Sequence, residues 1–371
     1  MYKFLFLIVY VNAFAQYSIA DSLMNVGDYN NAIKEYKKLD YHTKNYKIAK
    51  VLEAKGNNSE ALDYYKSYLK HDSLNVEVNF NYGLLLLNLS RNKEAQKTFE
   101  KLVNSNPNEV YFYYLGLAFE KDKDQINSLK NYASSVKLDS LYFKSNYKLA
   151  VFQSNSKQYS NALKITNRFL SKNSEDIEML KLRAQIYFAQ EDFINSIQDL
   201  NKLISLEQSD IFIFEKLAKS YFGNKEFQKS IDIYNTLIEN SDEENADYFY
   251  SRGKCYGYLG KTKEAEIDIN KAIKLKAVSF ENEYFYLGYF YQINQNLEKA
   301  LYYYDKTTKQ DRNHAEAVFQ MILINDYKGL NEEKLIKDFE KYLINFKNIS
   351  DERKSYIENR VKQLKQNSHM K

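Results

Sequence analysis

The sequence predicts an all-α solenoid of helix–turn–helix repeats, and three observations support this fold class. Pro107 is the only proline and there are only 10 glycines among 371 residues, whereas folds of strands and turns need many of both. Pairs of small residues, twelve positions apart, recur at intervals of 29 to 35 residues along the chain. Large apolar residues follow these small residues at helical spacing, which makes each repeat a pair of amphipathic helices.

Each repeat is marked by a first and a second small residue. The first small residues are Ala20, Ala49, Gly83, Gly116, Ala150, Ala184, Ala218, Gly253 and Gly288. The second small residues are Ala32, Ala61, Ala95, Ser128, Ala162, Ser196, Ser230, Ala265 and Ala300. A glycine inside a helix costs about 1 kcal/mol relative to alanine, so its recurrence needs a compensating reason. We infer that two helices cross at these positions too closely for a large side chain.

The spacing between the small residues and the large apolar residues indicates that both lie on the same buried face of each helix. In the first helix a large residue usually comes three positions after the small one, as with Leu52 and Tyr291. In the second helix an apolar or aromatic residue usually comes four positions after, as with Phe99 and Tyr304. Because alanine fills the position of Gly288 in five other repeats, the sequence predicts that Gly288→Ala is nearly neutral or stabilising and that Gly288→Leu overpacks the crossing.

The first fifteen residues have the layout of a secretory signal peptide. The positive start "MYK" precedes the apolar run "FLFLIVYV", and "NAFA" ends in an Ala-x-Ala pattern before Gln16. The run is shorter than the ~20 residues that span a bilayer, so we expect cleavage after Ala15 and no transmembrane segment afterwards. A buried N-terminal helix is the alternative. The sequence thus predicts an exported protein that is periplasmic, associated with the cell envelope or secreted. Its single cysteine, Cys255, excludes an internal disulfide.

The chain divides into three predicted segments. Residues 1–15 are the signal peptide, 16–346 the solenoid, and 347–371 a C-terminal capping helix with a basic tail. The solenoid has about nine clear repeats and a degenerate tenth, with "AVFQMILI" and "EEKLIKDFEKYLINF" as its helices. In the capping helix Ile357, Val361 and Leu364 share one stripe, as expected where a solenoid must present a polar face to water.

The period and the small residues resemble the tetratricopeptide repeat family. The resemblance is clearest in "LLLLNLSRNKEAQKTFEKLVNSNPN" (Leu84 to Asn108) and "YYLGLAFEKDKDQINSLKNYASSVKLDS" (Tyr113 to Ser140). It implies a right-handed superhelical solenoid whose first helices line a concave groove for protein partners. The chain departs from the family pattern in lacking tryptophan and most of the terminal prolines, and in the polar residues Gln153 and Thr166 of the fifth repeat.

Carried onto this chain, the resemblance implies a groove with aromatic anchors and a few cations. The candidate partner-binding residues are Lys181, Phe188, Lys219, Phe222, Tyr250, Lys254, Phe285 and Tyr289. Such a groove suits a protein segment that carries both apolar side chains and carboxylates. Two alternatives stay open: the acidic neighbours Glu178, Glu215 and Asp247 neutralise the lysines, or the aromatic residues only follow the composition of the chain.

The sequence gives no sign of catalytic chemistry. The four histidines show no metal-ligand spacing, and neither a phosphate-binding loop nor a dinucleotide-binding motif is present, so we expect no enzyme activity, no catalytic residue, no metal and no cofactor. The 53 basic and 49 acidic residues are interspersed, which argues against nucleic acid as a partner. We expect a non-catalytic protein that binds or scaffolds other proteins through its groove. The alternative is a regulatory or substrate-presenting subunit of an envelope enzyme or secretion complex.

Overall fold

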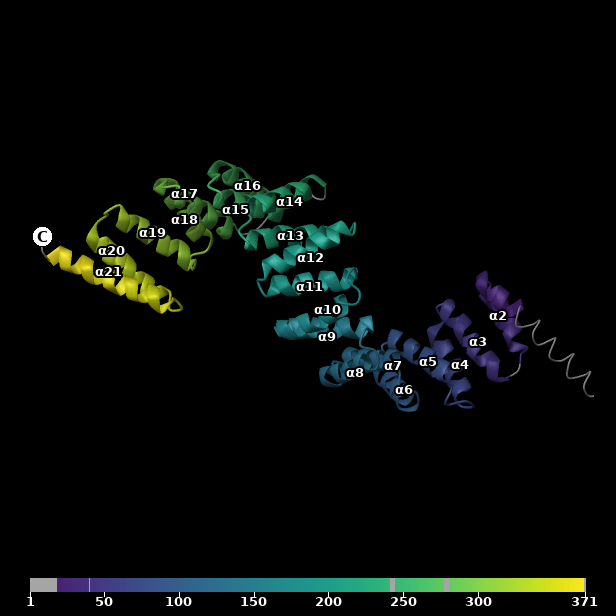
Figure 1. Ribbon diagram of the computed structural model, residues 1–371. Coiled ribbons are helices and arrows are strands. Elements are labelled where there is room, and N and C mark those ends of the chain that lie inside the picture. The colour runs from purple at the N-terminus through teal and green to yellow at the C-terminus, as the bar shows by residue number, and fades with distance from the viewer. Residues whose placement is uncertain (1–18, 40, 241–243, 277–279, 370–371) are drawn as a thin grey trace, which may run out of the picture. The chain divides into compact units, whose positions relative to one another are not determined.

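The computed structural model describes residues 19–39, 41–240, 244–276 and 280–369, and all regular elements within them are α-helices. The expected all-α repeat class is therefore confirmed (Figure 1). The expected signal peptide, residues 1–15, lies outside the described residues. The chain forms two compact units, which we call the N-terminal unit (Met1–Ser174) and the C-terminal unit (Glu175–Lys371).

Successive helices form antiparallel hairpins in both units. After a helical stretch at residues 19–25, the N-terminal unit contains α2 (Tyr29–Lys37), α3 (Tyr41–Ala54), α4 (Asn58–Leu69), α5 (Val76–Asn88), α6 (Asn92–Ser105), α7 (Glu109–Lys121), α8 (Gln125–Leu138), α9 (Phe143–Asn155) and α10 (Tyr159–Leu170). The C-terminal unit contains α11 (Ile177–Ala189), α12 (Phe193–Ser205), α13 (Ile211–Gly223), α14 (Phe227–Asn240), α15 (Ala246–Tyr258), α16 (Thr262–Leu275), α17 (Glu281–Ile293), α18 (Leu297–Gln310), α19 (Ala315–Tyr327), α20 (Glu332–Asn345) and α21 (Asp351–His369).

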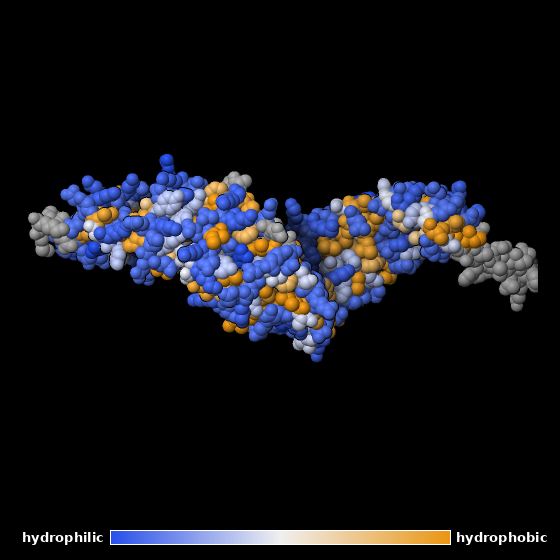
Figure 2. Space-filling model, turned by 90° about the horizontal axis from the view of Figure 1, so that it is seen from above, coloured by the Kyte–Doolittle hydropathy of each residue, from blue (hydrophilic) through white to orange (hydrophobic). Residues whose placement is uncertain are grey.

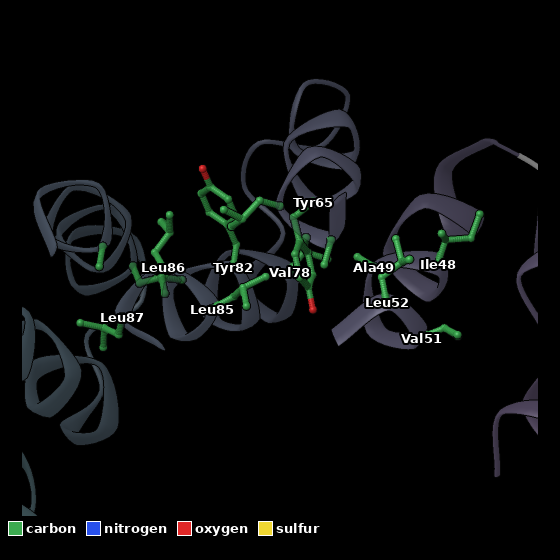
Figure 3. Packing of buried hydrophobic residues seen from close by; sticks show 14 of the residues in the cluster. Ile48, Ala49, Val51, Leu52, Tyr65, Val78, Tyr82, Leu85, Leu86 and Leu87 are labelled. Carbon is green, nitrogen blue, oxygen red and sulfur yellow. The ribbon is translucent and has the colours of Figure 1, made fainter. Parts of the chain in front are cut away.

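Hairpins stack on one another within each unit. From α3 onward, each odd-numbered helix up to α19 is the first helix of a hairpin and packs against the even-numbered helix that follows. First helices of successive hairpins also touch, as α5 touches α7, α11 touches α13 and α15 touches α17. The hydrophobic core therefore runs from hairpin to hairpin instead of gathering at one centre, as expected of a repeat protein. Figure 3 shows part of it, with Tyr65 of α4 beside Val78 of α5, and Ala49 and Leu52 of α3 to one side.

The small residues lie at the helix crossings, as the sequence predicts. All eighteen are buried. A Cβ atom added to Gly83 would lie 2.7 Å from the ring of Phe99, and one added to Gly116 would lie 2.8 Å from the ring of Tyr132. In both cases the ring comes from the residue four positions after the second small residue. The glycines are therefore required by the close approach of a large side chain from the second helix.

The expected tolerance of Gly288 to alanine is wrong. A Cβ atom at this position would lie 2.7 Å from the ring of Tyr304, well inside van der Waals contact. The Tyr304 ring is fully buried, and its hydroxyl donates a hydrogen bond of 2.7 Å to Oε1 of Gln292. Because this bond and the surrounding core hold the ring in place, even one methyl group overpacks the crossing. Alanine in other repeats is no guide to this one.

The C-terminal helix closes the stack of the C-terminal unit. Ile357, Val361 and Leu364 of α21 are buried in a cluster with Phe339 and Tyr342 of α20. The opposite face of α21 carries exposed charged residues, as a terminal helix that faces water requires. On the face of the molecule drawn in Figure 2, apolar residues form patches between hydrophilic ones. Among the described residues, no helix is long and apolar enough to cross a membrane.

Candidate partner-binding surface

All eight predicted groove residues lie on the first helices of the C-terminal unit. They come in pairs from four hairpins: Lys181 and Phe188 from α11, Lys219 and Phe222 from α13, Tyr250 and Lys254 from α15, and Phe285 and Tyr289 from α17. Each is one helical turn or one residue from the first small residue of its hairpin. None of the eight is fully buried at a helix crossing: Lys219 is exposed and the other seven are half-buried.

Four of the eight residues line one pocket of about 360 Å³. Its lining consists of Phe188, Phe193, Lys219, Phe222, Gly223, Tyr234, Ser251 and Lys254. Gly223 is essential to its shape, because a Cβ atom there would lie 2.5 Å from the ring of Phe193. The pocket therefore joins the first helices of three successive hairpins, with aromatic rings in its wall and two lysines beside them.

Neither lysine of this pocket is paired with a carboxylate in the described chain, and Lys254 lies against aromatic rings. The amine of Lys254 lies 4.9 Å from the ring centre of Phe222, 5.4 Å from that of Tyr250 and 4.4 Å from that of Tyr286. Among the described residues, neither Lys219 nor Lys254 has a carboxylate oxygen within 4.0 Å of its amine. Cations held over ring faces keep their charge available to a further anion.

Lys216, which the sequence analysis does not single out, extends this arrangement. Its amine lies 4.3 Å from the ring centre of Phe188 and 5.6 Å from that of Phe212. Burial lowers the pKa of Lys216, and the positive charge of Lys219 lowers it further, while Glu215 acts in the opposite direction. No carboxylate of the described chain forms an ion pair with Lys216.

Lys181 differs from Lys219 and Lys254, because carboxylates neutralise its charge. Its amine lies 2.7 Å from a carboxylate oxygen of Asp210 and 3.8 Å from one of Glu178. The hydrogen bond from Lys181 to Asp210 raises the pKa of the amine. The alternative that acidic neighbours neutralise the lysines thus holds for this residue, through Asp210 more than through the expected Glu178.

The other two acidic neighbours have different partners. Glu215 accepts a hydrogen bond of 2.7 Å from the hydroxyl of Tyr248, and Asp247 lies 3.8 Å from the amine of Lys276. Neither forms an ion pair with Lys219 or Lys254. The positive charge of the pocket is therefore not cancelled by the residues that the sequence suggested.

The three remaining groove residues lie outside the pocket lining. The ring of Tyr250 lies beside Lys254 and 6.0 Å from the ring of Tyr286. Phe285 stacks on His314, with ring centres 4.9 Å apart, so its ring belongs to the contact with the next hairpin. Tyr289 lies 6.4 Å from the ring of Tyr258. The structure therefore concentrates the candidate surface on α11, α13 and α15.

The described part of the chain contains no cluster of metal-binding side chains. No group of three histidine, cysteine or acidic side chains there is placed to hold a metal ion. Cys255 is buried, and burial raises the pKa of its thiol to about 11, so the thiolate needed for nucleophilic attack is scarce at neutral pH.

Comparison with known proteins identifies the repeat. The tetratricopeptide repeat family matches residues 46–110, and a second form of the same repeat matches residues 15–41 and 246–278. The comparison with curated proteins finds no match.

Solved structures of similar fold are distant in sequence. A tetratricopeptide repeat protein from Parabacteroides merdae is 18% identical, with 67% of this chain and 98% of that one covered and a TM-score of 0.46. YrrB, described as a tetratricopeptide repeat protein with an unusual peptide-binding site, is 15% identical, with 51% and 96% covered and a TM-score of 0.43. Yeast Tom70 is 12% identical, with 96% of both chains covered and a TM-score of 0.43.

The family matches fall in both units, and the hairpins between them have the same length and the same buried small residues at their crossings. The chain is therefore a tetratricopeptide repeat protein.

Proposed function

We propose that this protein is a non-catalytic scaffold that holds a protein or peptide partner on the first helices of its C-terminal unit. The observation that carries the proposal is the pocket between α11, α13 and α15, which is lined by Phe188 and Phe222 and by two lysines, Lys219 and Lys254, that have no carboxylate partner in the described chain. A charge left unpaired beside an apolar pocket favours a ligand of opposite charge that also has an apolar part.

The partner segment that fits this chemistry has an apolar or aromatic side chain with an acidic residue nearby. The side chain would enter between Phe188 and Phe222, and the carboxylate would meet Lys219 or Lys254. Buried aromatic contacts carry most of the affinity at such surfaces, whereas exposed charges act mainly on association rate and salt dependence.

Peptide selection tests the proposal without knowledge of the natural partner. Random peptides displayed on phage would be selected on the chain beginning at Gln16, and the enriched peptides would be measured by fluorescence polarisation. We expect acidic peptides with an aromatic or large aliphatic residue. The variant with Lys219→Glu and Lys254→Glu should bind them at least about tenfold more weakly, which corresponds to about 1.4 kcal/mol.

A matched control variant reverses the charge of two lysines outside the pocket. Lys97→Glu and Lys164→Glu change the net charge by the same amount on exposed positions of second helices in the N-terminal unit. This variant should bind the selected peptides as the wild type does. Equal weakening by both pairs would show that net charge alone attracts the peptides, and the pocket would lose its assignment.

Export is part of the proposal and rests on the N-terminal sequence alone. If the pattern "NAFAQ" is a cleavage site, the native protein begins at Gln16. Mass spectrometry of the protein from its own cells tests this directly. An intact Met1 on the native protein would contradict export through this signal, and the peptide-binding proposal would stand unchanged.

A further inference from the structure

A second and larger pocket lies near the C-terminal end of the chain, away from the lysine pocket. Its volume is about 850 Å³. The lining consists of Gln292, Gln295, Leu297, Leu323, Ile324, Asp326, Tyr327, Tyr356, Arg360 and Gln363. These residues come from α17, the turn after it, α18, α19 and α21, so the capping helix forms one wall. No residue is shared with the pocket around Phe222.

A bidentate ion pair fixes this wall and cancels its charge. Nε and Nη2 of Arg360 donate to the two carboxylate oxygens of Asp326 at 2.8 and 2.9 Å. Nη1 of Arg360 donates to Oε1 of Gln363 at 3.1 Å. Asp326 and Arg360 are the only charged residues in the lining, so the pocket offers no net charge. A charged ligand would have to break the pair, whereas a neutral ligand would not.

Two tyrosine rings in this lining are exposed. Tyr327 at the end of α19 is 83% exposed and Tyr356 on α21 is 46% exposed, although large aromatic side chains are usually more buried. Among the described residues, no hydrogen-bond partner accepts from or donates to either hydroxyl. The ring of Tyr356 also packs against that of Phe319, with ring centres 6.3 Å apart. The exposed part of each tyrosine ring and its hydroxyl are therefore available to whatever enters the pocket.

The other free groups are amides. Gln295 makes no side-chain hydrogen bond within the described chain, and the Nε2 group of Gln363 is free because only its oxygen is used by Arg360. Gln292 is already occupied, since it accepts from Tyr304 and donates to Gln320. Amides and phenols both donate and accept, which suits a ligand with many hydroxyl groups.

We propose that this pocket binds a neutral oligosaccharide. A sugar ring has a face of C–H groups that packs on an exposed tyrosine ring, and a rim of hydroxyls that exchange hydrogen bonds with amides and phenols. Leu297, Leu323 and Ile324 supply an apolar floor, and the volume lies within the range of ligand sites. The absence of net charge in the lining disfavours acidic sugars, phosphates and charged peptides. The inference does not depend on the proposed peptide binding.

Three neutral trisaccharides of different linkage serve as probes: maltotriose, cellotriose and triacetylchitotriose. Saturation-transfer NMR and calorimetry would be run on the chain beginning at Gln16, with each sugar up to about 10 mM, where affinities of a few kcal/mol become visible. We expect at least one trisaccharide to bind, with saturation passing to its ring protons. Tyr327→Ala and Tyr356→Ala should each weaken that binding at least about tenfold, while Tyr327→Phe should weaken it less.

Tyr302→Ala is the matched control, because Tyr302 is 54% exposed on α18 and does not line the pocket. It should bind the sugar as the wild type does, and Tyr327→Ala should still bind the peptides selected on the lysine pocket. The proposal is overturned if none of the three sugars binds, if Tyr327→Ala binds as tightly as the wild type, or if a uronic-acid trisaccharide or a capped neutral tripeptide binds more tightly than every neutral sugar.

Discussion

Two lysines at the same repeat position have different neighbours in the two units. Lys148 in the N-terminal unit and Lys216 in the C-terminal unit each lie two residues before the first small residue of their hairpin. The residue that each one faces is four positions after the first small residue of the preceding hairpin. In the N-terminal unit this residue is Glu120, 2.8 Å from the amine, and in the C-terminal unit it is Phe188, with its ring centre 4.3 Å away.

The difference extends to the second helix. Glu120 also accepts a hydrogen bond from the hydroxyl of the buried Tyr132. The position equivalent to Tyr132 in the hairpin of Phe188 is Leu200, which is buried and needs no acceptor. Both arrangements line a pocket, of about 420 Å³ around Glu120 and about 360 Å³ around Phe188. The difference is that tyrosine, glutamate and lysine bind one another in the N-terminal unit, whereas the pocket lysines of the C-terminal unit have no carboxylate partner in the described chain. The repeat specifies the scaffold, and a few side chains decide whether a surface stabilises the fold or meets a ligand.

Both units have close helix crossings at which a glycine meets a ring. Replacing these glycines should lower the stability of the protein more than any other substitution considered below. Gly116→Leu and Gly288→Leu each press a side chain into a buried tyrosine ring, so each should lower the free energy of unfolding by about 3 kcal/mol. Thermal melts followed by circular dichroism would show this, and the alanine variants should show a smaller drop. If either leucine variant melts at or above the wild-type temperature, the crossing in that unit is looser than the structure shows.

Exchanging the residues at the position shared by Glu120 and Phe188 tests the comparison directly. Glu120→Phe removes the acceptor of Tyr132 and the partner of Lys148, so we expect a loss of about 2 kcal/mol in stability. Phe188→Glu gives Lys216 a carboxylate and should change stability much less. Urea denaturation of both variants measures the contrast. Equal losses would show that the position has the same structural role in both units.

The aromatic rings and the lysines of the pocket should contribute unequally to peptide binding. Phe188→Ala with Phe222→Ala should weaken binding of the selected peptides by more than about tenfold. Lys219→Gln with Lys254→Gln should weaken it less, and more at low salt than at high salt, because screening already reduces their attraction. Binding isotherms at two salt concentrations separate the two effects. A double alanine variant that binds like the wild type would place the peptide elsewhere.

The sequence predicts the hairpins well because every repeat has small residues at its helix crossing, and these residues recur at nearly the same spacing. Ala49 and Gly288 are recognised by their period alone, and both are buried as expected. The period cannot tell how much room each crossing has, because that depends on the ring opposite. For this reason the predicted tolerance of Gly288 to alanine is wrong, although its predicted position at a helix crossing is right.

Contacts between hairpins are harder to predict. Lys216 and Phe188 are 28 residues apart, and Lys181 reaches Asp210 in the segment before the next hairpin. Arg360 and Asp326, which close the larger pocket, are 34 residues apart. These pairs depend on the angle and offset at which one hairpin packs against the next. The spacing of apolar residues within a helix does not determine that angle and offset. Comparing equivalent positions in successive repeats would have singled out Lys216, two residues before its small residue.

The smallest expected effect is a pH dependence of stability that arises from Lys216. Burial and Lys219 lower its pKa in the folded protein, whereas in the unfolded chain it returns to the usual lysine value of about 10.4. Between these two values the unfolded chain binds more protons than the folded one, so stability rises with pH through this window. At lower pH the amine is charged in both states, and the penalty of burying that charge is fully present.

Urea denaturation between about pH 8 and pH 10.5 would measure this rise, with Lys216→Gln as the reference that lacks the titrating group. The wild type should gain stability relative to Lys216→Gln as the pH increases. In Phe188→Glu the new carboxylate favours the charged amine, so its folded pKa should move up and the gain should shrink or change sign. If the wild type and Lys216→Gln run parallel over the whole range, the amine is as well solvated in the folded protein as in the unfolded chain. The contrast with the paired Lys148 would then rest on geometry alone.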